Sequence, residues 1–243
     1  MSGPGGDGAR ARELAAGLET VRGRIAAAAR DAGRDPAEID LLAVTKTWPA
    51  TDVAHLVDLG LSSFGEAKEQ EGAAKAAALT ELRPAAAPTW RVVGRLQRNK
   101  ARNLVRWVDA VDSVDSPRLS DALDAATGKA LDAGERTAPL SVLVQVSLDA
   151  DPARGGVPRD ELEALAARVA ASEHLRLDGL MTVVPREAEP AAAFAEFADL
   201  AARVRADHPG ATTVSAGMSN DLADAIAHGS TCVRVGTALL GGR

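Results

Sequence analysis

Eight short apolar segments run along the chain, and each is followed by a stretch whose apolar residues recur at helical spacing. Within the segments, apolar residues do not alternate strictly with polar ones, which is typical of strands in a parallel sheet buried on both faces. The connections are short, and nothing in the sequence marks a second domain. The expected strands are 39–45, 62–65, 90–93, 110–114, 140–148, 177–184, 212–215 and 231–235.

Eight strand–helix units in about 230 residues fit a (β/α)8 TIM barrel, whose usual length is about 250 residues. The alternative is a doubly wound open sheet, but no G-x-G-x-x-G or Walker A motif follows the first expected strand. Before that strand, apolar residues at helical spacing from Leu14 to Ile25 predict a helix over 11–32. We therefore predict one barrel domain over 11–243 with an extra N-terminal helix, and a flexible tail over 1–10.

The composition excludes several classes of function. A net charge of −6 over 243 residues argues against binding nucleic acid by broad phosphate neutralisation. The one cysteine, Cys232, cannot form an internal disulfide, and the four histidines lie far apart without metal-ligand spacing. The N-terminus has no signal-peptide pattern, and no apolar run approaches the roughly 18 residues of a membrane-spanning helix. We expect a cytoplasmic protein that binds no metal, no nucleic acid and no membrane.

Lys46 directly follows the apolar run of the first expected strand. The carboxyl ends of barrel strands carry the active site, and lysine supplies only five of the 28 basic residues. Unlike arginine, lysine has an amine that can lose its proton and attack a carbonyl. From its position alone, Lys46 either marks the strand exit and points into solvent, or is a Schiff-base lysine whose neutral amine is favoured by partial desolvation.

The ends of the seventh and eighth strands have the features of a phosphate-binding corner of a barrel. Gly217 and Gly236 allow the backbone to approach a ligand closely. Hydroxyl groups come from Ser215, Ser219 and Thr237, and two helix starts add backbone N–H groups for an anion. Ser219 can also cap the helix that follows, which is compatible with phosphate binding. With a lysine across the barrel mouth, this corner predicts a phosphorylated aldehyde, and pyridoxal phosphate fits.

Seven motifs occur in one order: LLAVTKT at 41–47, FGE at 64–66, VGRLQRNK at 93–100, VDSVD at 111–115, GLMT at 179–182, SAGMS at 215–219 and VRVGTA at 233–238. In these motifs the chain resembles the pyridoxal phosphate homeostasis protein family, single-domain relatives of the barrel of bacterial alanine racemase. The resemblance covers nearly the whole chain after residue 10, and it implies an alanine racemase-like TIM barrel with pyridoxal 5′-phosphate as its cofactor.

The resemblance also implies roles for the matching residues. In the family a lysine of the first strand holds the cofactor, which corresponds to Lys46. An arginine of the eighth strand faces the pyridine nitrogen, which corresponds to Arg234. Met181 would pack near the ring. The phosphate would be held by the matching residues of the two turns, which are Ser215, Gly217, Met218, Ser219, Gly236 and Thr237.

Three residues depart from the family's pattern. Ala67 follows Phe-Gly-Glu where the family commonly has Asn near the ring, and Arg91 stands where the family usually has His. Ala216 occupies a position that is often Met. We therefore expect fewer or different contacts with the cofactor ring, with the Schiff-base and phosphate positions intact.

Three functions are compatible with these features: a cofactor carrier without substantial turnover, an amino-acid racemase, and a barrel that binds another phosphorylated metabolite. Racemisation needs a base on each face of the substrate Cα, and in alanine racemase one base is a tyrosine that involves a separate domain and the partner subunit. This chain has no tyrosine and ends seven residues after Gly236. An arginine at the pyridine nitrogen also weakens the ring as an electron sink. The carrier is favoured. The resemblance implies a monomer, and we expect apo enzymes dependent on pyridoxal phosphate as its partners.

Overall fold

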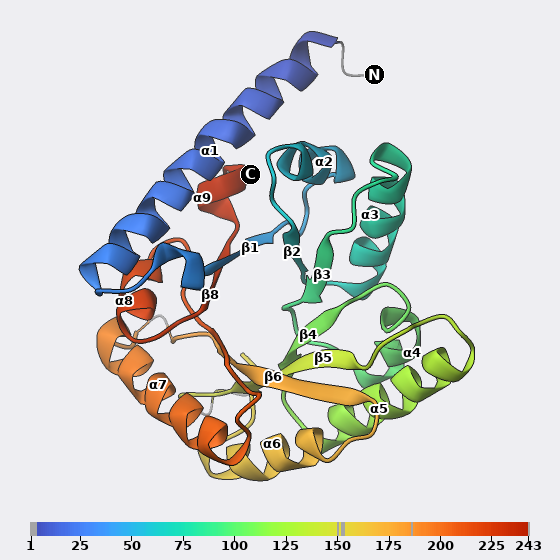
Figure 1. Ribbon diagram of the computed structural model, residues 1–243, viewed down its shortest axis with the longest axis vertical. Coiled ribbons are helices and arrows are strands. Elements are labelled where there is room, and N and C mark those ends of the chain that lie inside the picture. Colours follow the sequence, from blue (N-terminus) through green and yellow to red (C-terminus); the bar gives the residue numbers. More distant parts are fainter. Residues whose placement is uncertain (1–3, 150, 152–153, 186, 243) are drawn as a thin grey trace.

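The computed structural model describes residues 4–149, 151, 154–185 and 187–242, and their strands close into one barrel (Figure 1). Every neighbouring pair is parallel, and β1 pairs with β8 to complete the ring. The strands are β1 Asp40–Val44, β2 Ser63–Glu66, β3 Thr89–Val92, β4 Ala110–Val114, β5 Leu140–Val146, β6 Leu175–Thr182, β7 Thr213–Ser215 and β8 Cys232–Val235. The predicted (β/α)8 barrel is confirmed.

Helices follow the strands and form the outer layer of the molecule (Figure 1). They are α1 Pro4–Asp31, α2 Ala50–Asp58, α3 Glu69–Leu82, α4 Ala101–Leu104, α5 Pro117–Asp132, α6 Leu162–Ala170, α7 Pro190–Asp207, α8 Leu222–Ala227 and α9 Thr237–Leu240. Short 3-10 turns precede β1, α4 and α6, and they are η1 Pro36–Glu38, η2 Arg98–Lys100 and η3 Arg159–Glu161. No helix in the described part of the chain is both long and apolar enough to cross a membrane.

The N-terminal helix begins earlier than the sequence predicts. It starts at Pro4 rather than at residue 11, so part of the predicted tail is helical. Proline is tolerated in the first turn of a helix, because its missing N–H has no helical partner there. Residues 1–3 lie outside the described residues, and the flexibility of the segment 1–10 stays a prediction.

The segment after β3 is less helical than predicted. We expect one helix near 96–107, but the structure has only η2 and the four residues of α4 there. Arg98, Arg102 and Arg106 recur every four residues, and like charges at that spacing destabilise a continuous helix.

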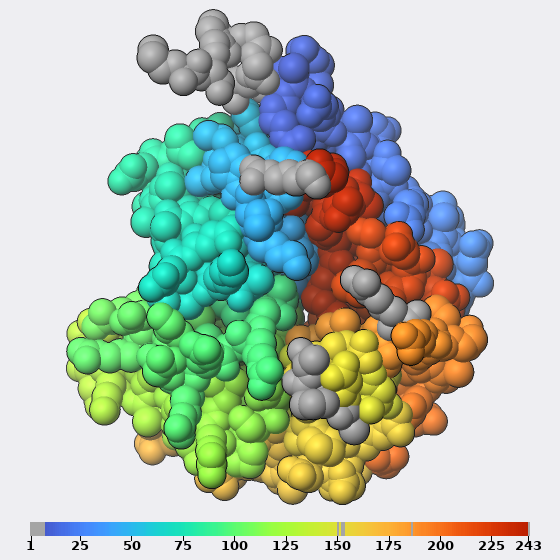
Figure 2. All heavy atoms as spheres, turned by 180° about the vertical axis from the view of Figure 1, so that it is seen from behind, coloured from blue at the N-terminus to red at the C-terminus, as the bar shows by residue number. Residues whose placement is uncertain are grey.

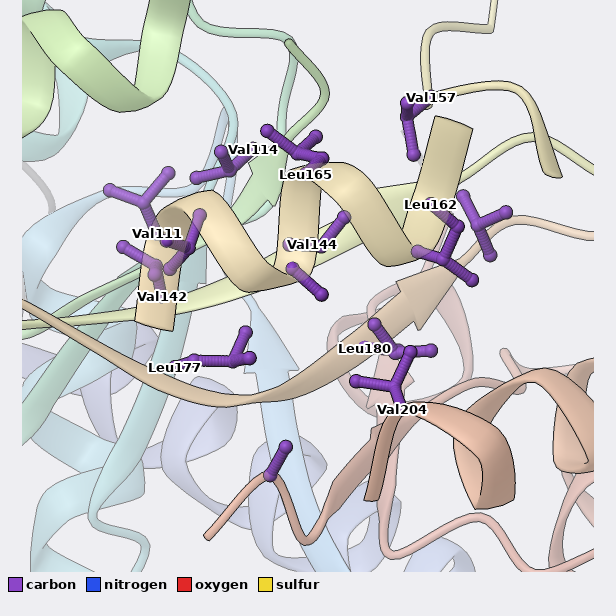
Figure 3. Packing of buried hydrophobic residues seen from close by; sticks show 14 of the residues in the cluster. Val111, Val114, Val142, Val144, Val157, Leu162, Leu165, Leu177, Leu180 and Val204 are labelled. Carbon is purple, nitrogen blue, oxygen red and sulfur yellow. The ribbon is translucent and has the colours of Figure 1, made fainter. Parts of the chain in front are cut away.

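Apolar side chains fill the layer between the barrel and its helices. Leu162 and Leu165 of α6 pack towards Val144 of β5 within the larger group of buried residues (Figure 3). Along β1, Leu41 and Ala43 belong to this outer layer. Successive side chains of a strand point to opposite faces, so the side chain between them points into the barrel.

The barrel interior differs from this outer layer because it contains charged side chains. Arg91, Asp112 and Arg234 are all buried, at 9%, 0% and 5% exposure. The neighbours of Arg234 in β8, Val233 and Val235, belong to the outer apolar layer, so Arg234 points inward. A buried charge requires a partner, and those partners define the candidate site.

The N-terminal helix connects the beginning and the end of the chain. α1 lies along α8 and α9 and also contacts α2 (Figure 1). From α1, Arg10 Nη2 donates to Asp52 Oδ2 at 2.7 Å and to Leu240 O at 2.9 Å. Figure 2 shows the opposite face of the barrel, where the β1–α2 segment (light blue) and the C-terminal segment (red) lie side by side.

Candidate functional site

Closure of the barrel brings the first and last strands together. Leu42 of β1 pairs with Arg234 of β8, and Ala43 pairs with Val235. The carboxyl ends of both strands therefore open onto the same part of the barrel face, where sites of this fold lie. Lys46 lies in the turn two residues after β1 ends, and Gly236 directly follows β8.

A cavity of about 990 Å³ opens at this place. Six of the nine residues predicted to bind the cofactor line it, and they are Lys46, Met218, Ser219, Arg234, Gly236 and Thr237. Trp48, Val184 and Pro185 contribute apolar surface to the wall, and none of them was predicted from the sequence. Segments that are far apart in the sequence thus share one space.

The other three predicted residues are not among the described residues that line the cavity. Met181 is fully buried on β6, between Gln145 and Ser215 of the adjoining strands. Ser215 is also fully buried, and its Oγ accepts a hydrogen bond from Arg234 Nη1 at 2.8 Å. Gly217 O accepts a hydrogen bond from the backbone N–H of Arg234 at 3.0 Å. Ser215 and Gly217 therefore hold Arg234, which lines the cavity.

Arg234 places a fixed positive charge at the base of the cavity. Besides the bond to Ser215, its Nη2 donates to the carbonyl of Thr182 at 2.6 Å. Burial lowers the pKa of the Arg234 guanidinium, while the carboxylate of Asp112 raises it. Arginine stays protonated in proteins, so this group remains a cation. The role of Thr182 was not predicted from the sequence. Thr182 accepts the bond through its backbone carbonyl, which every residue type has.

Two turns meet at the rim of the cavity. The N–H of Met218 donates to Asp221 Oδ1 at 2.5 Å, and the N–H of Ala238 donates to Ser219 Oγ at 3.4 Å. Ser219 is not the cap of α8, because Asp221 occupies the N-cap position of that helix. Its hydroxyl instead connects the turn after β7 to the start of α9.

Both turn glycines permit close approaches of the chain. Gly217 has φ +89°, and a Cβ there would lie 2.6 Å from the Cβ of Ala225 in α8. A Cβ on Gly236 would lie 3.3 Å from the carbonyl oxygen of Val44 at the end of β1. Gly217 therefore lets its turn pack on α8, and Gly236 lets the end of β8 lie against β1.

Of the two settings that the sequence left open for Lys46, the structure has the exposed one. Its side chain is not desolvated, although it lines the cavity. The chain does bury a lysine, but this is Lys75 of α3, which is 5% exposed. The Nζ atom of Lys75 donates to Thr45 O at 2.7 Å and to Glu66 Oε1 at 2.5 Å. Lys75 lies in an alanine-rich helix whose sequence gives no sign of this burial.

The three departures from the family's pattern do not contribute to the lining of this cavity. Ala67 lines a second cavity of about 1240 Å³, and Ala216 is buried in the outer apolar layer. Arg91 forms an ion pair inside the barrel, donating from Nε and Nη2 to the carboxylate of Asp112 at 3.1 and 2.8 Å. None of the three is among the described residues that line the 990 Å³ cavity.

Cys232 lies in the barrel interior beside this ion pair. Burial raises the pKa of its thiol to about 11, so it stays protonated and behaves as a small apolar side chain. Within the described ranges, no group of three or more His, Cys, Asp or Glu side chains is placed to hold a metal ion.

Residues 18–243 match the family model described as "Alanine racemase, N-terminal domain". The pyridoxal phosphate homeostasis protein of Mycobacterium bovis is 50% identical over 243 residues, covering 96% of this chain and 94% of that protein. The protein of the same name from Escherichia coli (strain K12) is 38% identical over 234 residues, covering 95% of this chain and 97% of that protein. The match to the family model includes the Lys46 turn and both glycine turns.

Solved structures show the same similarity in three dimensions. PipY of Synechococcus elongatus PCC7942, with pyridoxal phosphate bound, is 33% identical and superposes with a TM-score of 0.78. The match covers 94% of this chain and 100% of PipY. The whole barrel, and not a fragment of it, is therefore shared.

Proposed function

Because the chain belongs to the pyridoxal phosphate homeostasis proteins, within the alanine racemase N-terminal domain family, we propose that it binds pyridoxal 5′-phosphate in intracellular homeostasis of that cofactor. One observation carries the proposal. The amine of Lys46, the guanidinium of Arg234 and two glycine turns line one cavity. A relative, PipY, holds the same cofactor in a solved structure.

The donors in the cavity suit the parts of this cofactor. An amine can bind an aldehyde, and Lys46 is the lysine among the cavity's described lining residues. Hydroxyls and backbone N–H groups bind phosphate, and these come from Ser219, Thr237 and the turns around them. At Gly236 an added Cβ would lie 3.3 Å from Val44 O. A residue with a side chain at this position would therefore crowd the end of β1.

Each group then has a separate task. Lys46 would hold the cofactor through Nζ, and the turns at 218–219 and 236–237 would hold the phosphate. Arg234 would face the ring nitrogen, and its positive charge disfavours a proton there. Met181 would pack near the ring, while Ser215 and Gly217 would hold Arg234 in place, with Ser215 orienting the guanidinium. When bound, pyridoxal phosphate supplies an electron sink for a carbanion.

The decisive test is chemical labelling of Lys46. After addition of pyridoxal phosphate, borohydride reduction and peptide mapping should show the cofactor on Lys46. Lys46→Ala should lose both the label and the visible absorbance of bound cofactor. Lys129→Ala is the matched control, since Lys129 is an exposed lysine on α5. Label on another lysine with Lys46 unmodified would contradict the proposal, and no spectral change at all would favour another phosphorylated metabolite.

We further propose that the protein carries its cofactor without substantial turnover of amino acids. Racemisation needs a base on each face of Cα, and the 243 residues include no tyrosine. The fixed cation of Arg234 disfavours a protonated ring nitrogen and so weakens electron withdrawal from Cα. The relatives are named for homeostasis and not for a reaction.

Isotope exchange tests this second proposal. The loaded protein is incubated with L- or D-alanine in deuterated water, and deuterium uptake at Cα and loss of chirality are followed together. We expect at most a trace of exchange, because Lys46 can serve as a base on one face only. Turnover of about 1–10³ per second that Lys46→Ala abolishes would instead establish a racemase-like enzyme.

A carrier needs acceptors, and we propose apo enzymes that depend on pyridoxal phosphate as the partners. The acidic net charge of −6 disfavours nucleic acid as a partner. We also place the protein in the cytoplasm, in keeping with its sequence, and propose that it is a monomer, in keeping with its family. Reactivation of an apo enzyme by the loaded protein, faster than by free cofactor released into solution, would show direct transfer.

A further inference from the structure

A buried lysine holds the residue that precedes Lys46. Lys75 Nζ donates to the carbonyl of Thr45 at 2.7 Å and to Glu66 Oε1 at 2.5 Å. It also lies 3.3 Å from Glu71 Oε1, so its three protons are all used. The hydroxyl of Thr45 donates to Glu66 Oε1 at 2.6 Å. Thr45 is thus held through both its backbone and its side chain.

The residue that follows Lys46 has a strained backbone. Thr47 has φ +69°, and among the described residues it is the one non-glycine residue with positive φ. A β-branched residue adopts this conformation at an energetic cost, and it persists only where its surroundings hold it. The backbone N–H of Thr47 donates to Glu71 Oε1. Strained residues gather at functional sites, and this one adjoins Lys46 in the wall of the cavity.

We propose that Glu71, itself held by Lys75, is a positioning residue for Lys46. Its hydrogen bond with Thr47 keeps Thr47 in the left-handed conformation. That conformation determines the path of the turn that brings Lys46 and Trp48 to the cavity. This inference rests on the proposed function, because it gives the turn a role in capturing the aldehyde. Glu71 does not need to touch the cofactor, since it acts through the backbone of Thr47.

Glu71 is also the member of the cluster that can be substituted without breaking the fold. Glu66 is fully buried, and its Oε2 has no hydrogen-bond partner within the described part of the chain. Its charge is balanced by Lys75, so removing either residue leaves an uncompensated buried charge. The side chain of Glu71 is 29% exposed, so water can replace it.

Three variants separate positioning from a general loss of structure. Glu71→Ala removes the acceptor of the Thr47 N–H, whereas Glu71→Gln keeps an oxygen in the same place. Glu81→Ala removes an exposed carboxylate from the same helix and serves as the control. For each variant, NMR gives the exchange rate of the Thr47 amide without cofactor, and absorbance titration gives the Kd for pyridoxal phosphate. Thermal unfolding shows that each variant is folded.

We expect Glu71→Ala to speed exchange of the Thr47 amide at least tenfold and to raise the Kd about tenfold. Glu71→Gln should stay within about threefold of the parent in both measurements, and Glu81→Ala should match the parent. Unchanged amide exchange in Glu71→Ala would overturn the inference, as would faster exchange with an unchanged Kd. If the parent protein captures no pyridoxal phosphate, the proposed function fails instead. The amide exchange, which needs no cofactor, still decides whether Glu71 holds the turn.

Discussion

Two of the cavities on the face of the barrel that carries the βα loops differ in chemistry more than in size. The larger, of about 1240 Å³, lies beyond the ends of β2, β3 and β4, and many of its lining residues are charged. The smaller, of about 990 Å³, lies where β1 meets β8. The predicted cofactor residues gather at the smaller one.

The difference lies in how the charges are held. Lys68 and Arg98, which line the larger cavity, have exposed side chains, and an exposed charge is solvated and changes position freely. Arg234, in the smaller cavity, is buried and donates to Ser215 and Thr182. A charge held in one position before the ligand arrives needs no reorganisation on binding. Fixed geometry, more than volume or number of charges, therefore identifies the candidate site.

Removing the fixed charge is expected to have the largest effect. Arg234→Met keeps a side chain of similar length but leaves Ser215 Oγ and Thr182 O without their donor. We expect the Kd for pyridoxal phosphate to rise by more than tenfold, which is above about 1.4 kcal/mol. The free energy of unfolding should fall by about 2–4 kcal/mol. Absorbance titration and urea unfolding measure the two effects.

The control for this variant is Arg168→Met, because Arg168 forms an exposed ion pair with Asp121 on the outside of the barrel. It should change neither the Kd nor the stability appreciably. A folded Arg234→Met protein that binds the cofactor as tightly as the parent would show that Arg234 does not contribute to binding. The fixed charge would then not distinguish the binding cavity from the other one.

A smaller effect is expected where the backbone forms the wall. In Gly236→Val the new Cβ would lie 3.3 Å from Val44 O, and its methyl groups would crowd the turn that faces the cavity. We expect the Kd to rise about tenfold, with a loss of about 1–3 kcal/mol in stability from overpacking. Gly210→Val is the control, since a Cβ there meets nothing within 4 Å. Binding that equals that of the control would place the phosphate elsewhere.

The smallest effect is expected in the larger cavity. Removing two of its cations in the double variant Arg98→Ala, Lys100→Ala should leave the Kd within about twofold and the stability within about 0.5 kcal/mol. The same absorbance titration provides the measurement. A tenfold loss of affinity would show that the larger cavity takes part in cofactor binding. It would contradict the assignment of the site to the smaller cavity alone.

Local pattern was enough to predict the strands. The segment 110–114 coincides with β4, and each of the other expected strands overlaps its observed counterpart within about two residues. The helix predicted near 96–107 is shorter in the structure, which has η2 and the four residues of α4 there. Like charges at Arg98, Arg102 and Arg106 disfavour a longer helix, and hydrophobic spacing contains no information about them.

The sequence by itself determined that Lys46 follows a buried strand and that two glycine turns end the last two strands, because a strand and its exit are local features. Only the tertiary structure decided which lysine is buried. Lys75 is desolvated because Thr45, 30 residues away, and Glu66, nine residues away, come within bonding distance of its amine. Burial and hydrogen bonding depend on which distant segments the closed barrel brings together, and residue spacing along the chain does not contain that information.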